Sequence, residues 1–384
     1  MNYKRILAVI LALIMIFTLS ACDDSSSKST VSNSSAISSL DVTSDITSQT
    51  TTSVATKQSS STATTSKKTT TTVEASSVNT SKQNTSSSTT NKSKVTPTLY
   101  KVTDKKGNIV WLFGSIHIGK KDFYPLPDYV MNAFESADAL AVEFDLVAFE
   151  KDTAEQTKAM AKLISPNYST KSHLVGDSAA SIYRKAVEIL DKNNMYNSSL
   201  NDYYKPVMWS TLIDNLTYQK AGAASEYGVD RHLLNRAKQK KKKIEEIESA
   251  ESQYSMLAGF SDALQTKMLE DAIKGYESNT AKAELDTLMG LWGKGNASEL
   301  GELLNQDLSA LMNETDTQKR EILNEYYTAM YTDREYVMTD YIVNALNSGK
   351  EVFVCVGAAH IVRGSSIIDR LKIVHKCTVE EVKY

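Results

Sequence analysis

The sequence predicts an α/β domain of mixed α+β type, in which a small central sheet is built from N- and C-terminal segments around a large helical insertion. Three observations predict it. Residues 99–113 contain two short apolar runs separated by a turn, residues 150–348 mostly repeat apolar residues at three- and four-residue spacing, and a strand pattern returns at 351–356. The domain is therefore expected to cover 99–384.

The first part of the sheet is expected to be a hairpin. Residues 99–103 and 109–113 read as its strands, and the turn-like sequence Asp-Lys-Lys-Gly-Asn at 104–108 joins them. The second strand runs on to His117. A helix is expected after Pro127 and through Ala133, and residues 139–144 form the next strand. This order of strand, helix and strand is typical of a crossover unit.

The long middle of the chain, 150–348, is expected to be helical because apolar residues recur on one helical face. The basic run at 238–243 is interpreted as a solvated turn after a helix, because glutamates flank it at 245, 246 and 248. The alternative for this run is a weak contact with phosphate or lipid headgroups. A strand at 351–356, a short helix at 365–371 and a last strand at 377–382 complete the domain.

The N-terminus predicts export and a lipid anchor. Residues 1–5 form a short basic segment, and residues 6–19 are apolar apart from Thr18. This apolar run is too short to span a bilayer core, which needs about 20 apolar residues. Leu-Ser-Ala-Cys at 19–22 resembles a lipobox. We therefore expect a signal peptide at 1–21, a lipid on Cys22 and an extracytoplasmic protein anchored to the membrane. The alternative is a plain cleaved signal with an incidental cysteine.

Residues 22–98 are expected to be a Ser/Thr-rich disordered tether. The segment has no aromatic residue and only one proline, so it cannot bury enough apolar surface to offset its chain entropy. Flexible-chain scaling gives it a root-mean-square span of roughly 50 Å. The net charge of −3 gives no reason to expect a nucleic-acid partner.

Two cysteines remain beyond Cys22. Cys355 and Cys377 both lie in strand-like segments, and an extracytoplasmic location would permit a disulfide between them. Two thiols do not make a metal site. The sequence leaves a buried pair and a disulfide as alternatives, and the buried pair is favoured slightly.

Two of the five histidines share one local pattern. Gly114 precedes His117, and Gly357 precedes His360, each pair following an apolar strand. A glycine at a strand end permits close approach of the backbone, and strand ends are where open α/β sheets usually hold ligands. A single histidine after a strand is more often a core or loop residue, but the repetition favours a shared site.

Glu143 also closes an apolar strand, so three strand ends can present two imidazoles and a carboxylate to one cleft. Such a set suits a divalent metal with open positions for water. The metal could support hydrolysis by lowering the pKa of bound water, or it could simply be bound without turnover. No GxSxG sequence is present, which argues against a Ser-His-Asp hydrolase.

These motifs occur within a longer ordered set, which resembles the TraB/GumN family, a family that also includes the Tiki proteins. The resemblance covers nearly all of 99–384. It is carried by Leu112-Phe-Gly-Ser-Ile-His117, Leu126-Pro127, Ala141-Val-Glu143-Phe-Asp145, Gly228-Val-Asp230, Ile247-Glu248-Ser249 with Gln253, Trp292 with Gly295, Asp333-Arg334 with Met338, and Val356-Gly-Ala-Ala-His360.

The resemblance implies a metal-dependent, hydrolase-like domain, with peptide-bond cleavage dependent on a divalent cation such as manganese or cobalt in Tiki-like members. Zinc is the other candidate metal. By position, His117, Glu143 and His360 would be metal-binding or catalytic residues. The supporting groups would be Gly114, Gly357, Asp230, Glu248 and Arg334. Two of these have simpler alternatives: Asp230 could cap the helix that follows it, and Arg334 could be an ordinary surface cation.

The sequence also departs from the family pattern. Glu335 stands where an asparagine commonly follows the landmark arginine, and Arg363 stands where many members have a glycine. The main alternative to the enzyme is a non-catalytic surface protein that binds or sequesters a peptide or a small ligand. The two hypotheses differ in whether the three strand-end side chains meet in one pocket.

Overall fold

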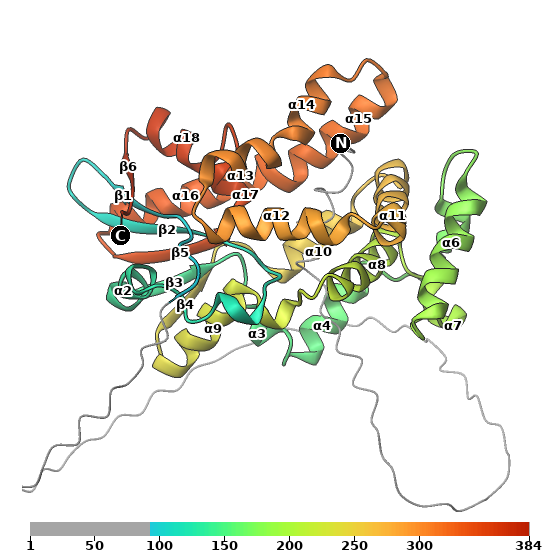
Figure 1. The fold of residues 1–384 in the computed structure, drawn as a ribbon, viewed down its shortest axis with the longest axis horizontal. Coiled ribbons are helices and arrows are strands. Elements are labelled where there is room, and N and C mark those ends of the chain that lie inside the picture. The colour runs from blue at the N-terminus through green and yellow to red at the C-terminus, as the bar shows by residue number, and fades with distance from the viewer. Residues whose placement is uncertain (1–92, 384) are drawn as a thin grey trace, which may run out of the picture. The chain divides into compact units, whose positions relative to one another are not determined.

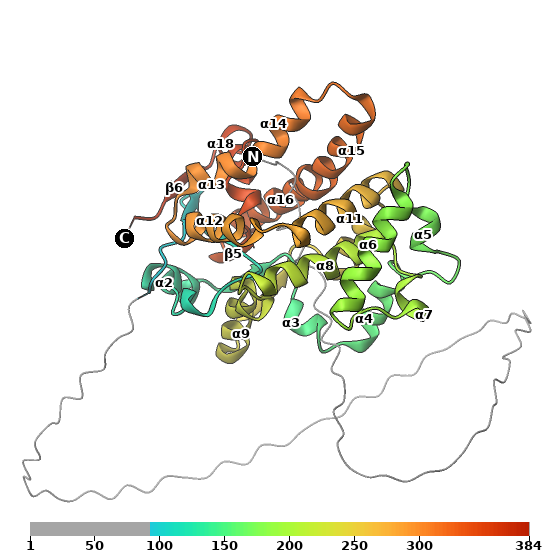
Figure 2. The same ribbon diagram turned by 45° about the vertical axis from the view of Figure 1, so that its right-hand side comes forward.

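The computed structural model of the chain describes residues 93–383 (Figures 1 and 2). The predicted signal peptide at 1–21, Cys22 and the tether up to residue 92 lie outside the described residues. At the start of the described part, Val95 is buried and the Thr96 amide donates to the Gly293 carbonyl at 2.7 Å. The chain therefore contacts the domain from Val95 onward.

The domain is built on one six-stranded mixed sheet with the strand order β4-β3-β5-β2-β1-β6, which confirms the predicted fold class. The C-terminal strand β5 lies between β2 and β3, so both ends of the domain do contribute to the sheet. β2, β5, β3 and β4 run parallel, whereas β1 is antiparallel to both β2 and β6. The strands are β1 Leu99–Thr103, β2 Ile109–Ser115, β3 Ala139–Val142, β4 Lys243–Glu246, β5 Val352–Gly357 and β6 Thr378–Glu381.

The edge strand β4 corrects the prediction for 150–348, which placed helices and a turn in this segment but no strand. The basic run does contain a turn after a helix, with Lys241 in the left-handed region at φ 55°, but Lys243 then starts a strand parallel to β3. β4 has only one apolar residue, Ile244, and neither of its ends is buried. Because an edge strand pairs on one side only, it needs no continuous apolar run, and its sequence carries little strand signal.

Alternating residues of the strands face two separate cores. On one face, Phe113, Leu140 and Phe353 pack with α2 and α9, the helices Asp128–Ser136 and Val229–Lys240. On the other face, Val354 packs against α16 and α18, the helices Asp333–Ser348 and Ile367–Ile373. Both faces of the parallel strands are thus covered, which explains why β3 and β5 are buried at every position.

The insertion between β3 and β5 is mainly helical. Figures 1 and 2 show α6, α8 and α11 lying away from the sheet, while α12 approaches the strands. No helix within 93–383 is both long enough and apolar enough to span a membrane. The remaining helices are α3 Leu146–Phe149, α4 Thr153–Met160, α5 Thr170–His173, α6 Ala179–Lys192, α7 Ser198–Asn201, α8 Pro206–Lys220, α10 Ala250–Ala258, α11 Asp262–Glu277, α12 Ala281–Gly293, α13 Ala297–Leu304, α14 Gln306–Asn313, α15 Thr317–Tyr327 and α17 Ala359–Val362, with the short turns η1 Lys121–Phe123, η2 Ser225–Tyr227 and the π-helical η3 Thr328–Thr332.

Both cysteines of the domain are free thiols, so there is no disulfide between them. Cys355 is fully buried in β5 and belongs to the core on one face of the sheet, whereas Cys377 is only partly buried and packs against the core of the other face. They are therefore not the buried pair that the sequence favoured. The sheet between them keeps the thiols apart.

Candidate functional site

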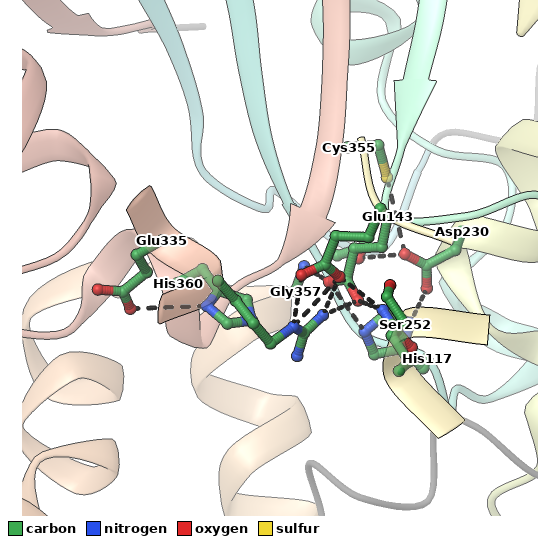
Figure 3. A network of polar contacts seen from close by, with 12 residues as sticks. His117, Glu143, Asp230, Ser252, Glu335, Cys355, Gly357 and His360 are labelled. Atoms are coloured by element: carbon green, nitrogen blue, oxygen red, sulfur yellow. Dashed lines mark hydrogen bonds and ion pairs between the residues drawn. The ribbon is translucent and has the colours of Figure 1, made fainter. Parts of the chain in front are cut away.

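The candidate site lies where the parallel strands end. Because the carboxyl ends of β2, β5, β3 and β4 meet at one edge of the sheet, the residues that follow them are brought close together. His117 follows β2, Glu143 follows β3, Glu248 follows β4, and His360 lies in α17 just after β5. His117, Glu143 and His360 line the same pocket, and Figure 3 shows their side chains in one network.

Gly114 and Gly357, the glycines three residues before His117 and His360 (the GxxH motifs), are positions where a side chain would press on its neighbours. A Cβ atom on Gly357 would lie 3.3 Å from His117 Nε2, 3.4 Å from Glu143 Oε1 and 3.6 Å from His360 Cδ2, so this glycine sits at the centre of the three side chains. A Cβ on Gly114 would approach the backbone of Ala358 to 3.0 Å. The glycine of each motif therefore lets the β2 and β5 ends pack tightly together.

Glu143 is a buried carboxylate held from several sides. Its Oε1 accepts the Gly357 amide at 2.8 Å, and its Oε2 accepts Arg334 Nη2 at 2.6 Å and Gln253 Nε2 at 3.2 Å. Burial alone would raise the pKa of Glu143, but the charges of Arg334, His117 and His360 outweigh it and hold the pKa far below its usual value. Glu143 is thus a fixed negative charge at neutral pH.

Arg334 joins two glutamates and is not a surface cation. The side chain is 6% exposed, and its guanidinium also donates to both carboxylate oxygens of Glu248. Burial would lower the pKa of Arg334, but the two carboxylates raise it. A buried arginine that orients carboxylates in this way is a common support for a charged site.

Asp230 lies against His117. Its Oδ2 is 2.6 Å from His117 Nδ1, and its Oδ1 accepts the Ser115 hydroxyl. Among residues 93–383 Asp230 accepts no backbone N–H bond that would cap α9, and the N-cap position is Gly228, so the capping alternative is wrong. Burial would lower the pKa of His117, but the charges of Asp230 and Glu143 outweigh it and raise the pKa. With Nδ1 beside Asp230, His117 Nε2 faces the pocket and lies 3.8 Å from Glu143 Oε1.

His360 has its own carboxylate neighbour, Glu335, which sequence reasoning did not place in the site. Glu335 Oε1 lies 3.5 Å from His360 Nδ1, and both side chains are almost fully buried. Figure 3 shows Glu335 on the side of His360 that faces away from Glu143. The adjacent residues Arg334 and Glu335 thus reach two different residues of the site, directly after the π-helical turn η3. Such turns often occur at functional sites.

Gln253 is the second residue whose position in the site was not predicted. It lies in α10 and is 2% exposed, and its Nε2 donates to Glu143 and to Glu248 Oε2, the latter at 2.7 Å. The only sequence signal was its place in the family-like stretch after Glu248. One amide therefore links two carboxylates that follow neighbouring strands.

The opposite wall of the pocket is apolar and comes from the helical insertion. It is formed by side chains of α12 and α13, namely Leu285, Leu288, Met289, Leu300 and Leu304. The cavity volume is about 50 Å³, room for a few atoms or water molecules. Trp292 Nε1 donates to the Gly114 carbonyl at 2.8 Å, which ties α12 to the end of β2.

The donor set is chemically suited to a divalent cation. His117 Nε2 and the Nδ1 atoms of both histidines are buried and make no hydrogen bond among residues 93–383. A carboxylate oxygen nevertheless lies 2.6 Å from His117 Nδ1 and 3.5 Å from His360 Nδ1, the position at which metal-binding histidines usually have one. In the described conformation, however, no three His, Cys, Asp or Glu side chains within 93–383 are at metal-bonding distance of a common point. The three candidate ligands share a pocket without forming a closed cage.

Comparison with known proteins defines the family. Residues 98–374 match the model of the TraB/PrgY/gumN family, and the chain belongs to this family. The chain is similar to a protein named "Uncharacterized protein YbaP" from Escherichia coli (strain K12) and to its Shigella flexneri counterpart, each 27% identical over 182 residues. Those matches cover 47% of this chain and 62% of each relative. No solved structure matches the chain.

Proposed function

We propose that the domain is a hydrolase that cleaves peptide bonds and requires a divalent cation such as manganese, cobalt or zinc. The observation that supports this most is the meeting of His117, Glu143 and His360 in one pocket at the ends of three neighbouring parallel strands. The family membership is consistent with this function, and the name of the matched relative adds nothing about activity.

In this proposal His117, Glu143 and His360 hold the cation, which would lower the pKa of a bound water molecule. Arg334 and Gln253 fix the carboxylate of Glu143 and keep it charged. Glu143 is suited to bind charge rather than to remove a proton, because its lowered pKa makes it a weak base at neutral pH. Asp230 and Glu335 orient the two imidazoles.

The apolar wall limits what can enter the pocket. Five aliphatic or thioether side chains of α12 and α13 face the charged network across a narrow cavity. Burial of apolar surface contributes roughly 25 cal/mol per Å². The wall therefore favours a substrate whose reacting peptide group is flanked by a small apolar group on the side of α12 and α13.

The test is metal binding and peptide cleavage by the full chain purified in detergent. We expect one bound cation by calorimetry and cleavage of a peptide mixture, detected by mass spectrometry. His117→Ala and His360→Ala should each lose both properties. His375→Ala is the matched control, because His375 does not line the pocket. If the protein binds peptides but does not bind metal and does not cleave peptides, it is instead the non-catalytic binding protein.

We also propose that the protein is extracytoplasmic and anchored to the membrane by a lipid on Cys22. The support is the sequence of residues 1–22. Cell fractionation should recover the wild-type chain with membranes, and Cys22→Ser should abolish both lipid labelling and processing before residue 22. A wild-type chain that is processed but carries no lipid would refute the anchor and leave a plain secreted protein.

A further inference from the structure

The loop that carries His117, residues 116–119, is paired with the segment that leads into α9, residues 224–230. Backbone hydrogen bonds run from the Val229 amide to the Ile116 carbonyl at 2.9 Å, from the Gly119 amide to the Ala224 carbonyl at 3.0 Å and from the Ala224 amide to the Gly119 carbonyl at 3.1 Å. These bonds flank His117 on both sides in the chain. The segment 224–230 thus fixes the backbone of His117 and also carries Asp230, the carboxylate beside its Nδ1.

Two glycines allow the loop and the segment to approach each other this closely. A Cβ atom on Gly228 would overlap with the carbonyl oxygen of His117, and a Cβ atom on Gly119 would overlap with the carbonyl oxygen of Tyr227. No larger residue fits at either position unless the backbone moves. The position of the His117 backbone therefore depends on where the Tyr227–Gly228 backbone lies.

Tyr124 holds that backbone by its carbonyls. The Tyr124 hydroxyl donates to the Tyr227 carbonyl at 2.9 Å and to the Gly228 carbonyl at 3.1 Å. Its ring stacks on His232 of α9, with the ring centroids 4.2 Å apart. Burial and then the charge of Asp230 raise the pKa of Tyr124 well above its ordinary value, so the hydroxyl remains a donor at neutral pH.

The two carbonyls that Tyr124 contacts lie within three residues of Asp230 in the chain. Asp230 Oδ2 is 2.6 Å from His117 Nδ1, and Figure 3 shows the two side chains next to each other. Tyr124 is not among the described residues that line the pocket of His117 and His360. Any effect of the Tyr124 hydroxyl on that pocket must therefore pass through the segment 224–230.

We propose that Tyr124 is a positioning residue for His117, and that it acts by holding the segment 224–230, which fixes the backbone of His117 and orients its imidazole through Asp230. The inference rests on the proposed function, in which His117 Nε2 faces a cation. The orientation of a metal-binding imidazole is usually set by the group that contacts its other ring nitrogen. Tyr124 is thus one contact further from the site than Asp230.

The first test needs no metal. In the metal-free full chain, purified in detergent, the proton on His117 Nδ1 should give a downfield NMR signal that disappears in His117→Ala. Tyr124→Phe removes only the hydroxyl and keeps the ring against His232, and it should move this signal upfield or broaden it beyond detection. Tyr341→Phe is the matched control, because it also removes one hydroxyl, which donates to Glu245 Oε2 at 2.5 Å, and it should leave the signal unchanged.

The second test is calorimetric titration with Mn²⁺. Tyr124→Phe should weaken binding about tenfold and Asp230→Asn roughly 10–100-fold, as when the outer partner of a metal-binding histidine is lost. Combining them should cost less than about twofold beyond Asp230→Asn alone, since both act through one contact. An unchanged NMR signal or Mn²⁺ affinity in Tyr124→Phe, an equal signal change in Tyr341→Phe, or additive losses would each overturn the positioning role. A wild type that binds no Mn²⁺ while the signal responds as expected would refute the cation site alone.

Discussion

Replacing Arg334 by methionine should destabilise the domain strongly. The side chain is 6% exposed and is hydrogen-bonded to two buried glutamates, so the substitution leaves Glu143 and Glu248 without their counter-charge. Removing one partner of a buried ion pair typically costs about 3–5 kcal/mol. For a domain of this size we expect the Tm to fall by roughly 10 °C. Differential scanning calorimetry and urea unfolding would measure the change.

The loss should arise from unpaired charge, and this can be separated from lost packing. Adding Glu143→Gln and Glu248→Gln to Arg334→Met should recover a large part of the stability, because neither glutamate charge is then left buried without the guanidinium. Arg334→Lys should lie in between, since lysine keeps the charge but not the planar fork. If Arg334→Met costs less than about 1 kcal/mol, or if the neutral triple variant is no better than Arg334→Met, the network does not stabilise the fold as argued.

Three further outcomes are expected. Gly357→Ala should abolish cation binding with little loss of helicity by circular dichroism, because the new Cβ would crowd His117 Nε2. Gly275→Ala is the control: its Cβ has open space, and the substitution should raise stability by about 0.5–1 kcal/mol. Unchanged cation binding by Gly357→Ala would contradict the packing. Maleimide labelling with peptide mapping should modify Cys377 well before Cys355, because burial and the charge of Asp230 raise the pKa of the Cys355 thiol. Equal labelling rates would show that β5 opens readily. The pKa of Glu143 in the folded protein lies below its ordinary value of 4.5, so the stabilising effect of its charge is present above pH 4.5 and is lost as the pH falls further. Between pH 7 and pH 3 the Tm should therefore drop more for the wild type than for Glu143→Gln. Parallel curves of Tm against pH would contradict this.

The sheet was predictable where strands are buried on both faces. The runs at 109–113, 139–142 and 352–356 are apolar throughout, so their composition alone indicates strands. β4 was not predictable in this way, because an edge strand with two glutamates resembles the solvated end of a helix. Its position depends on pairing with β3, which lies about a hundred residues earlier in the chain.

The site was only partly predictable for a similar reason. The repeated GxxH pattern and the glutamate at a strand end can be recognised locally, because each follows its own strand. The partners cannot: Asp230 meets His117 only after α9 packs on the sheet, and Glu335 reaches His360 only because α16 crosses the other face. Gln253 carries no charge and no motif of its own, so its two carboxylate contacts become visible only in three dimensions.

The place of β5 in the chain affects when the domain can become complete during synthesis. β5 lies between β2 and β3 in the sheet, yet it follows the whole helical insertion in sequence. A nascent chain that has not yet added Val352–Gly357 has no strand to join its two earlier ones, and His117 and Glu143 have nothing to hold them side by side. Early termination of translation should therefore yield an inert chain rather than a partly working one.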